Sequence, residues 1–421
     1  LIMNIAIIGS GGREHAICQK LAESPKVKKI YTIPGNGGTS QFSKNLKIDI
    51  QNFKKLYEAL VKYKIKFVVI GPEQPLIDGV ADFLRKKKIQ VFGPSRFASK
   101  LEGSKSFVKK LCKKNKIPTA DFKVCKKISD VKKFLKNNKL PIVVKADGIA
   151  SGKGVMICNK REQVLNFSKE IFRGKFKSSK KLVLEEFLEG EELSYFSIVD
   201  KKTISFFGSA QDHKRVGENE TGPNTGGMGA YSPAPILDEV LEKKILFRII
   251  KPTLKYLKRI KNPYTGFLYT GLMIRNNDPY LVEYNVRMGD PECQVILPRL
   301  KTDLFSIILA ATSNKLRKIK IKWKKRKCMT IVLCSKGYPG NYLKNKSLEK
   351  LKKLNIKKNM FIFHAGTKNV ENKIFSSGGR VLNFTMLGKS FYKIRLEILK
   401  TLRKFKWKYG FFRKDIGWRI L

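Results

Sequence analysis

The sequence predicts an α/β protein that opens with a doubly wound parallel sheet. Residues 5–8 and 67–70 are short runs of Ile, Val, Phe and Ala that each end at a glycine, as buried parallel strands do. The segment between them repeats apolar residues with the spacing of one helix face, at Phe53, Leu56, Tyr57, Leu60 and Val61. A strand, a helix and a second strand in this order form a βαβ unit, which implies an open sheet covered by helices.

Length and composition exclude several classes of protein. At 421 residues the chain is too long for one hydrophobic core, so we expect two to four domains, and 42% hydrophobic residues exclude a largely disordered chain. No apolar run approaches the roughly 20 residues that span a bilayer, and the run 5–8 is too short for a signal peptide. The seven cysteines include no C-x-x-C pair, which favours reduced, buried thiols over zinc sites or disulfides. We therefore expect a cytoplasmic enzyme, with Met3 as its natural start.

The net charge of +54 would normally indicate a nucleic-acid partner. The lysines are spread along the whole chain, however, together with abundant Ile, Asn and Phe, which favours compositional drift on solvated faces. The densest basic run, residues 315–327, either hosts a polyanion or forms an exposed strand or linker whose lysines protect an edge. We expect no specific nucleic acid and no membrane among the partners.

Three glycine-bearing segments, 9–14, 35–38 and 71–73, fall where ligands bind in such sheets, at the carboxyl ends of strands. Glycines between a strand and a helix let backbone N–H groups converge on an anion. The spacing G-x-G-G differs from the dinucleotide pattern G-x-G-x-x-G, so the phosphate of a small metabolite is favoured over NAD. A tight strand–helix turn without a ligand is the alternative.

Residues 145–154 place a strand lysine before a glycine loop that carries a second lysine. The loop is not a Walker A motif, because Gly154 stands where Ser or Thr would follow Lys153. Such a loop can close over phosphates while the strand lysine neutralises their charge, and a structural turn is the alternative. The acidic strand end at 185–192 can offer backbone groups to adenine and a carboxylate to ribose hydroxyls, or it is a solvated acidic turn.

Glu283 and Asn285 lie two apart in a predicted strand, so both side chains point to one face. Two oxygen ligands on one face suit Mg²⁺, which keeps water and substrate phosphate as its other ligands. Arg287 falls on the same face and can bind a phosphate or a carboxylate bidentately. The exposed face of an edge strand is the alternative interpretation.

In this order, the motifs resemble the phosphoribosylamine–glycine ligase (glycinamide ribonucleotide synthetase) family of ATP-grasp enzymes. The resemblance runs essentially end to end and includes residues 101–105, 211–215, 222–229, 264–269, 289–292, 363–367, 378–380 and 413–418. It implies an ATP-grasp enzyme in four parts. These are an N-terminal Rossmann-like domain (1–103), a glycine-loop lobe (104–192), a metal-bearing lobe (193–325) and a small C-terminal α/β module (326–421).

The resemblance also implies the reaction. ATP, glycine and 5-phospho-β-D-ribosylamine give ADP, phosphate and glycinamide ribonucleotide through a glycyl phosphate, in the second step of de novo purine (IMP) biosynthesis. ATP and Mg²⁺ or Mn²⁺ are the implied cofactors, the partners are small-molecule substrates, and a monomer is expected. The alternatives are another ATP-grasp carboxylate–amine ligase or carboxylase, and a basic nucleic-acid-binding protein.

Residue roles follow from the resemblance position by position. The metal ligands are Glu283 and Asn285, and the residues around glycine and the acyl phosphate are Asp212, Lys214, Arg287 and Asp290. The ATP contacts are Lys105, Lys145, Gly152, Lys153, Gly154, Glu185, Glu186, Phe187, Leu188 and Glu192. The ribose phosphate end is assigned to Gly11, Gly12, Arg13, Glu14, Asn36, Gly37 and Glu73.

Many ATP-grasp enzymes carry another metal carboxylate about a dozen residues before Glu-x-Asn. In this chain the corresponding residues, 270–274, contain no acid, so a second metal site would need a ligand from elsewhere.

Overall fold

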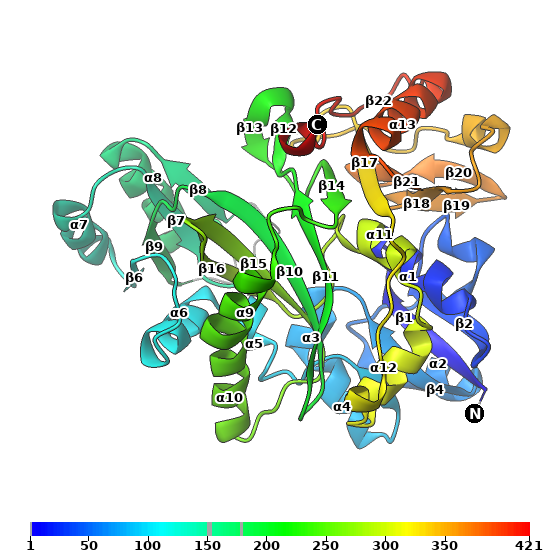
Figure 1. Ribbon diagram of the computed structural model, residues 1–421, viewed down its shortest axis with the longest axis horizontal. Coiled ribbons are helices and arrows are strands. Elements are labelled where there is room, and N and C mark those ends of the chain that lie inside the picture. Colours follow the sequence, from blue (N-terminus) through cyan, green and yellow to red (C-terminus); the bar gives the residue numbers. More distant parts are fainter. Residues whose placement is uncertain (1, 150–153, 177–179) are drawn as a thin grey trace.

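The computed structural model describes residues 2–149, 154–176 and 180–421, and its elements confirm the predicted α/β class (Figure 1). The N-terminal domain contains a five-stranded parallel sheet in the order β3-β2-β1-β4-β5. Its strands are β1 (Met3–Gly9), β2 (Val27–Pro34), β3 (Lys44–Asn45), β4 (Ile65–Ile70) and β5 (Gln90–Phe92). Its helices are α1 (Gly12–Ala22), η1 (Thr39–Gln41), α2 (Phe53–Lys62), α3 (Glu73–Asp78) and α4 (Val80–Lys86). The strand order reverses at β1, so the loops after β1 and β4 face one crevice.

A small lobe with its own hydrophobic core follows the N-terminal domain. Its antiparallel sheet has the order β6-β9-β7-β8, and Figure 1 shows it standing out from the rest of the molecule. The strands are β6 (Phe122–Cys125), β7 (Ile142–Ala146), β8 (Val155–Cys158) and β9 (Leu182–Glu186). The helices are α5 (Lys100–Gly103) and α6 (Lys105–Lys114), which lead into the lobe, and α7 (Ile128–Asn137) and α8 (Arg161–Phe172).

A large nine-stranded sheet joins the remaining parts, in the order β16-β15-β10-β11-β14-β17-β21-β18, with β22 beside β17. Its strands are β10 (Glu191–Val199), β11 (Ile204–Asp212), β14 (Gly229–Ser232), β15 (Gly266–Arg275), β16 (Asp278–Asn285), β17 (Lys327–Ser335), β18 (Met360–His364), β21 (Arg380–Gly388) and β22 (Gly410–Phe411). Because β14 pairs with β17, the sheet continues across the predicted boundary between the metal-bearing lobe and the C-terminal module.

Two hairpins and several helices complete this part of the fold. The hairpins are β12 (Arg215–Gly217) with β13 (Thr221–Asn224), and β19 (Thr367–Val370) with β20 (Lys373–Ser376). The helices are α9 (Glu239–Ile245), η3 (Leu246–Ile250), α10 (Lys251–Arg259), α11 (Cys293–Ile296), α12 (Leu304–Thr312) and α13 (Phe391–Phe405). Short turns of 3₁₀-helix are η2 (Glu218–Glu220), η4 (Leu297–Arg299), η5 (Leu316–Lys318), η6 (Glu349–Lys353) and η7 (Trp418–Ile420). Within the described residues, none of the helices is both long enough and apolar enough to cross a membrane.

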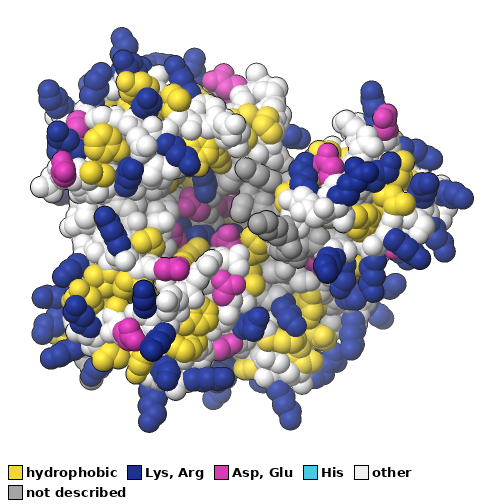
Figure 2. All heavy atoms as spheres, turned by 180° about the vertical axis from the view of Figure 1, so that it is seen from behind, with side chains coloured by type: hydrophobic (Ala, Val, Ile, Leu, Met, Phe, Trp, Pro, Cys, Tyr) yellow, Lys and Arg dark blue, Asp and Glu magenta, His cyan; other side chains and the backbone are white. Residues whose placement is uncertain are grey.

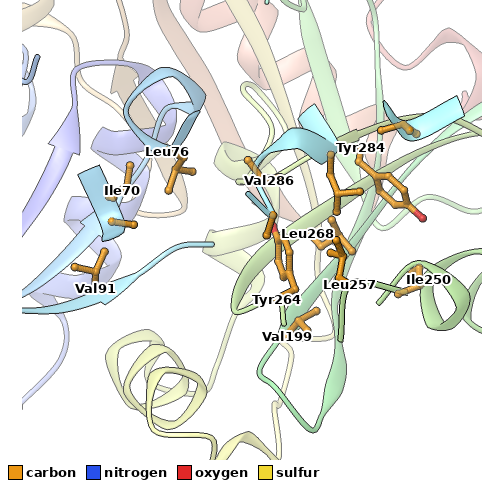
Figure 3. Packing of buried hydrophobic residues seen from close by; sticks show 14 of the residues in the cluster. Ile70, Leu76, Val91, Val199, Ile250, Leu257, Tyr264, Leu268, Tyr284 and Val286 are labelled. Atoms are coloured by element: carbon orange, nitrogen blue, oxygen red, sulfur yellow. The ribbon is translucent and has the colours of Figure 1, made fainter. Parts of the chain in front are cut away.

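The hydrophobic core continues from the N-terminal domain into the large sheet. One cluster of buried residues includes Ile70 and Leu76 of the N-terminal domain together with Tyr264, Leu268 and Val286. Figure 3 shows these side chains on either side of the boundary. Burial of apolar area at about 25 cal/mol per Å² therefore stabilises the placement of the N-terminal loops against the end of β16.

The basic run 315–327 is a linker packed along the body of the protein. Ile319, Ile321 and Trp323 alternate inward onto a buried cluster, while the intervening lysines are largely exposed. Lys324 N donates to Arg299 O at 2.7 Å, which fixes the extended chain against the end of η4. The alternation of lysine with apolar residues thus reflects a half-buried linker that leads into β17.

All three histidines are buried at contacts between parts of the chain. His15 Nδ1 accepts from His364 N at 2.8 Å, and His213 Nε2 accepts from Gly417 N at 3.0 Å. Burial lowers the pKa of His15 and of His213 to about 3 and that of His364 to about 4. The side chains are therefore neutral and structural, and all seven cysteines are also buried and unpaired, as predicted.

These lowered pKa values make stability depend on pH. Below about pH 6.5 the unfolded chain takes up protons on these side chains, whereas the folded chain does not until about pH 4, so stability falls as pH falls. Lowering the pH from about 7.5 to about 5.5 should cost about 1.4 kcal/mol per histidine. Glu102, whose pKa is raised to about 7 chiefly by burial, acts in the opposite sense. The measurement is urea unfolding of wild type and His15→Asn at both pH values.

Asparagine keeps an acceptor near the position of the His15 Nδ1 atom but does not titrate. The variant should therefore lose about 1.4 kcal/mol less than wild type over the same pH change. Equal losses in both proteins would contradict the assignment of His15 as a buried neutral group.

Candidate active site

The predicted site residues come from the small lobe, the large sheet and the N-terminal loops, and several of them contact or attract one another. Figure 2 shows one face of the molecule, with Asp and Glu side chains gathered in a hollow and Lys and Arg projecting around it. Acidic groups are scarce in this chain, 34 against 88 Lys and Arg, so their gathering here marks a region with its own chemistry.

The loop after β1 is built around the carboxylate of Glu14. Glu14 Oε2 accepts from Gly11 N at 2.6 Å and Oε1 accepts from Arg13 Nε at 2.6 Å. Arg13 also donates to Met288 O at 3.1 Å, and both side chains are buried. A Cβ on Gly12 would stand 2.5 Å from Gln294 Nε2, so a side chain at this position would displace that amide. The loop therefore offers backbone rather than these two side chains to a ligand.

Asn36 and Gly37 form the neighbouring loop. The Asn36 amide donates to Ser10 O and His364 O, at 2.9 and 2.8 Å, and accepts from Gly38 N at 2.8 Å. Its side chain is thus used to join the loops after β1 and β2 to the C-terminal module. The N–H of Gly37 donates to Thr367 Oγ1 at 3.2 Å. Both residues shape the crevice through contacts within the protein.

Lys105 and Lys145, the two lysines predicted to face phosphate, are held by contacts within the protein. Asp147 accepts from Ser106 N at 3.1 Å in the first turn of α6, whose first residue, Lys105, donates to Gly148 O at 2.9 Å. Lys145 pairs with Glu185 at 3.0 Å, and the buried Lys109 pairs with the same carboxylate at 3.0 Å.

The predicted adenine hinge lies at the end of β9. Glu185 turns its carboxylate inward to the two lysines, and its Oε1 atom is buried without a hydrogen-bond partner in the described residues. Glu186 Oε1 accepts from Asp121 N at 3.0 Å, Phe187 is half-buried and Leu188 is buried. Of the glycine loop, Gly154 O accepts from Ala146 N at 2.7 Å, while Gly152 and Lys153 lie outside the described residues.

The carboxylate of Glu283 is attracted by several lysines of the site. Burial alone would raise the pKa of its carboxyl, but the attraction of Lys214, Lys145 and Lys105 outweighs burial and lowers it. Lys214 in turn lies 3.4 Å from Glu192, and the attraction of Glu192 above all raises the pKa of Lys214. The carboxylate of Glu283 forms no hydrogen bond or ion pair in the described part of the chain.

The donor set at the end of β16 fits a divalent cation that keeps other ligands. Hydrogen bonding orients the Asn285 amide with its nitrogen toward Glu102 Oε1, at 3.1 Å, and Tyr284 O, at 3.0 Å, which turns its oxygen away from these two acceptors. The described residues hold no cluster of three or more His, Cys, Asp or Glu able to bind a metal. A carboxylate and an amide oxygen are enough for Mg²⁺, which retains waters and phosphate oxygens.

Arg287 joins the large sheet to the N-terminal domain. It donates to Glu73 Oε2 at 3.1 Å and to Glu102 Oε1 at 2.6 Å. Burial opposes ionisation of Glu73, yet Arg287 and then Arg13 lower the pKa of Glu73 to about 2. The structure thus brings together two residues, Arg287 and Glu73, that the resemblance assigned to different substrates.

Asp212 and Glu292 are two buried carboxylates without an ion-pair partner among the described Lys and Arg side chains. Asp212 Oδ1 accepts from His213 N at 2.6 Å, and Glu292 Oε1 accepts from Ser194 Oγ at 3.2 Å. Burial, followed by the charge of Glu292, raises the pKa of Asp212 well above its usual value. A small cation would relieve the repulsion between the two groups.

Asp290 joins all three parts of the molecule. Its Oδ2 atom accepts from Arg13 N at 3.1 Å, and its backbone O accepts from Arg380 Nη1 at 2.6 Å. Gln294 Nε2 donates to Asp290 Oδ1 at 2.7 Å. Arg380 was recognised in the sequence only as part of a motif, because its partner lies 90 residues away.

A groove of about 620 Å³ lies away from these residues, beside α10. Apolar side chains and lysines such as Phe247, Leu254 and Lys251 line it, and none of the predicted site residues does. The predicted site residues therefore do not belong to this groove.

Comparison with known proteins gives the same family along the chain. Models of phosphoribosylglycinamide synthetase match residues 3–102 (N domain), 103–293 (ATP-grasp (A) domain) and 328–419 (C domain). The chain is 42% identical over 420 residues to the phosphoribosylamine–glycine ligase of Brucella melitensis, covering 100% of this chain and 98% of the relative. It is also 42% identical over 424 residues to that of Haemophilus influenzae, covering 100% and 99%.

Solved structures with a similar fold include a member of the same family. The phosphoribosylamine–glycine ligase of Thermotoga maritima superposes with a TM-score of 0.84 at 31% identity, covering 98% of this chain and 99% of that chain. The biotin carboxylase–β,γ-ATP complex from Campylobacter jejuni shares the fold, with a TM-score of 0.72 at 14% identity over 98% of this chain and 92% of that chain. By its sequence and its fold, the chain belongs to the phosphoribosylamine–glycine ligase family.

Proposed function

We propose that this chain is an ATP-dependent ligase that joins glycine to 5-phospho-β-D-ribosylamine. The products are glycinamide ribonucleotide, ADP and phosphate, in the second step of de novo purine biosynthesis. The observation that carries the proposal is the charge pattern around Glu283, which faces Lys105, Lys145 and Lys214, in a chain 42% identical over its length to a phosphoribosylamine–glycine ligase.

The carboxylate of glycine is a poor electrophile, so it must be activated before an amine can attack it. The carboxylate of glycine attacks the γ-phosphorus of ATP, the bond to the β-phosphate oxygen breaks, and glycyl phosphate and ADP form. The nitrogen of the ribosylamine then attacks the acyl carbon, loses a proton, and phosphate leaves. In our proposal Lys105, Lys145 and Lys214 stabilise negative charge on the phosphates throughout.

No side chain of the enzyme has to act as a covalent nucleophile. All three histidines and all seven cysteines of the chain are buried. Catalysis would therefore rest on alignment of the three substrates and on charge stabilisation. Glu283 and the oxygen of Asn285 would hold Mg²⁺ or Mn²⁺, which when bound neutralises phosphate oxygens. We also propose that the enzyme is a cytoplasmic monomer.

The reaction is tested by phosphate release from ATP, Mg²⁺, glycine and freshly prepared phosphoribosylamine, with each substrate omitted in turn. Phosphate release should require all three substrates. ADP formation that is independent of glycine and requires bicarbonate would instead support an ATP-grasp carboxylase.

Replacement of Glu283 by Gln should reduce turnover by about 100-fold or more, because it removes the charged metal ligand. The melting temperature should not fall, since this carboxylate has no ion pair in the described residues. The measurement is kcat together with thermal unfolding in the absence of metal.

Glu239→Gln is a matched control, because Glu239 is exposed on α9 and the substitution removes the same charge. This variant should keep normal kcat. Near-normal turnover of Glu283→Gln would overturn the metal assignment.

Asp212, with Glu292 beside it, is our proposed binding group for the ammonium of glycine. Asp212→Asn should raise the KM for glycine about 10–100-fold, the loss expected for one charge-assisted hydrogen bond. The KM for ATP should stay within about threefold, because ATP binds to different residues. Steady-state titration of each substrate makes the measurement.

The raised pKa of Asp212 adds a pH dependence to this proposal. Ammonium binding favours the ionised carboxylate, so glycine binding releases a proton and the KM for glycine should fall as pH rises. The amide that replaces this carboxyl in Asp212→Asn cannot ionise, so the variant should lose this slope. An unchanged KM and an unchanged slope would refute the role of Asp212.

A further inference from the structure

We propose that Glu102 is a positioning residue that fixes the amide of Asn285 with its oxygen toward the metal position. This inference rests on the proposed function, in which Glu283 and Asn285 hold the cation. Glu102 belongs to the four-residue helix α5, which connects the N-terminal domain to α6 and the small lobe.

Glu102 contacts three consecutive residues at the end of β16. Its Oε2 atom accepts from Val286 N at 2.8 Å, and its Oε1 atom accepts from Arg287 Nη2 at 2.6 Å. The Asn285 amide nitrogen donates to the same Oε1 atom at 3.1 Å. The side chain of Glu102 is only 8% exposed, so water does not replace these contacts readily.

An amide side chain has a donor end and an acceptor end, and only the oxygen can bind a hard cation. On one side of Asn285 stand two acceptors, Glu102 Oε1 and Tyr284 O. The reversed amide would place its oxygen against both of them and leave its nitrogen facing the cation. Glu102 therefore decides which end of Asn285 the cation meets.

Glu73 allows this role to be separated from a purely structural one. Both Glu73 and Glu102 pair with Arg287, at 3.1 and 2.6 Å, so loss of either carboxylate weakens the same contact between domains. Glu102 accepts from the amide of Asn285, however, whereas within the described residues Glu73 forms no hydrogen bond with that amide. A change in metal affinity that is confined to Glu102 variants would therefore come from Asn285.

Glutamine at position 102 cannot satisfy the same donors. If its NH₂ group faces Asn285, the Asn285 amide must turn its oxygen away from the metal. If its NH₂ group faces Val286 N, a donor meets a donor in a buried place. Aspartate at position 285 presents oxygens at both ends, so it does not depend on orientation by residue 102.

The test is binding of Mn²⁺ in the presence of a non-hydrolysable ATP analogue, followed by electron paramagnetic resonance of the free ion. Glu102→Gln should raise the Kd for Mn²⁺ about 10–100-fold, the range found for residues that orient metal ligands. Glu73→Gln should change this Kd by less than about threefold. The double variant Glu102→Gln/Asn285→Asp should regain most of the lost affinity. Thermal unfolding without metal reports whether each variant is folded.

Two results would overturn the proposal: an unchanged Kd in Glu102→Gln, or an equal loss in Glu73→Gln and Glu102→Gln. Should Glu102→Gln fail to fold, Glu102→Asp replaces it, since its shorter carboxylate draws away from Asn285. Wild-type affinity in that variant would equally overturn the proposal. Failure of the proposed metal site is distinguishable, because Mn²⁺ binding would then survive Glu283→Gln.

Discussion

The arrangement of the candidate site depends on three arginines, Arg13 buried and Arg287 and Arg380 half-buried, whose hydrogen bonds tie residues 286–292 to the N-terminal domain and to the C-terminal module. Arg13 of the N-terminal domain donates to Met288 O, Arg287 donates to Glu73 and Glu102, and Arg380 of the C-terminal module donates to Asp290 O. A guanidinium keeps its charge when buried and offers several donors in a fixed plane. Because this segment begins beside the metal pair and ends at Glu292, its placement sets the distance between the proposed metal and glycine positions.

The charges of the candidate site compensate one another before any substrate binds. Glu185 is shared by Lys145 and Lys109, and Lys214 pairs with Glu192 and is also attracted by Glu283. Such pairs lower the cost of burying lysines, and that cost would otherwise favour their neutral form. The phosphates of ATP can then replace the acids as partners of some of these lysines. Before ATP binds, Lys145 and Lys214 are already paired with acids.

The sequence could predict features that depend on local periodicity. The runs 5–8 and 67–70 lie in β1 and β4, and the two-residue spacing placed Glu283 and Asn285 on the same strand, β16. It could not predict partners set by the tertiary fold, such as Glu102 for Arg287, 185 residues apart. Lys109 gave no signal among 88 Lys and Arg, and Glu185 turns inward because β9 lies beside β7.

The charge of the outer surface has little influence on the charged groups of the candidate site. Exposed lysines act through water and salt, which screen them beyond about 8 Å, whereas charges in the candidate site interact through protein. The outer surface can therefore become strongly basic without changing the contacts of Glu283 or Asp212. A basic exterior still favours the approach of ATP and of a sugar phosphate, both anions, at low ionic strength. The net charge of +54 is thus compatible with a small-molecule ligase and does not require a nucleic-acid partner.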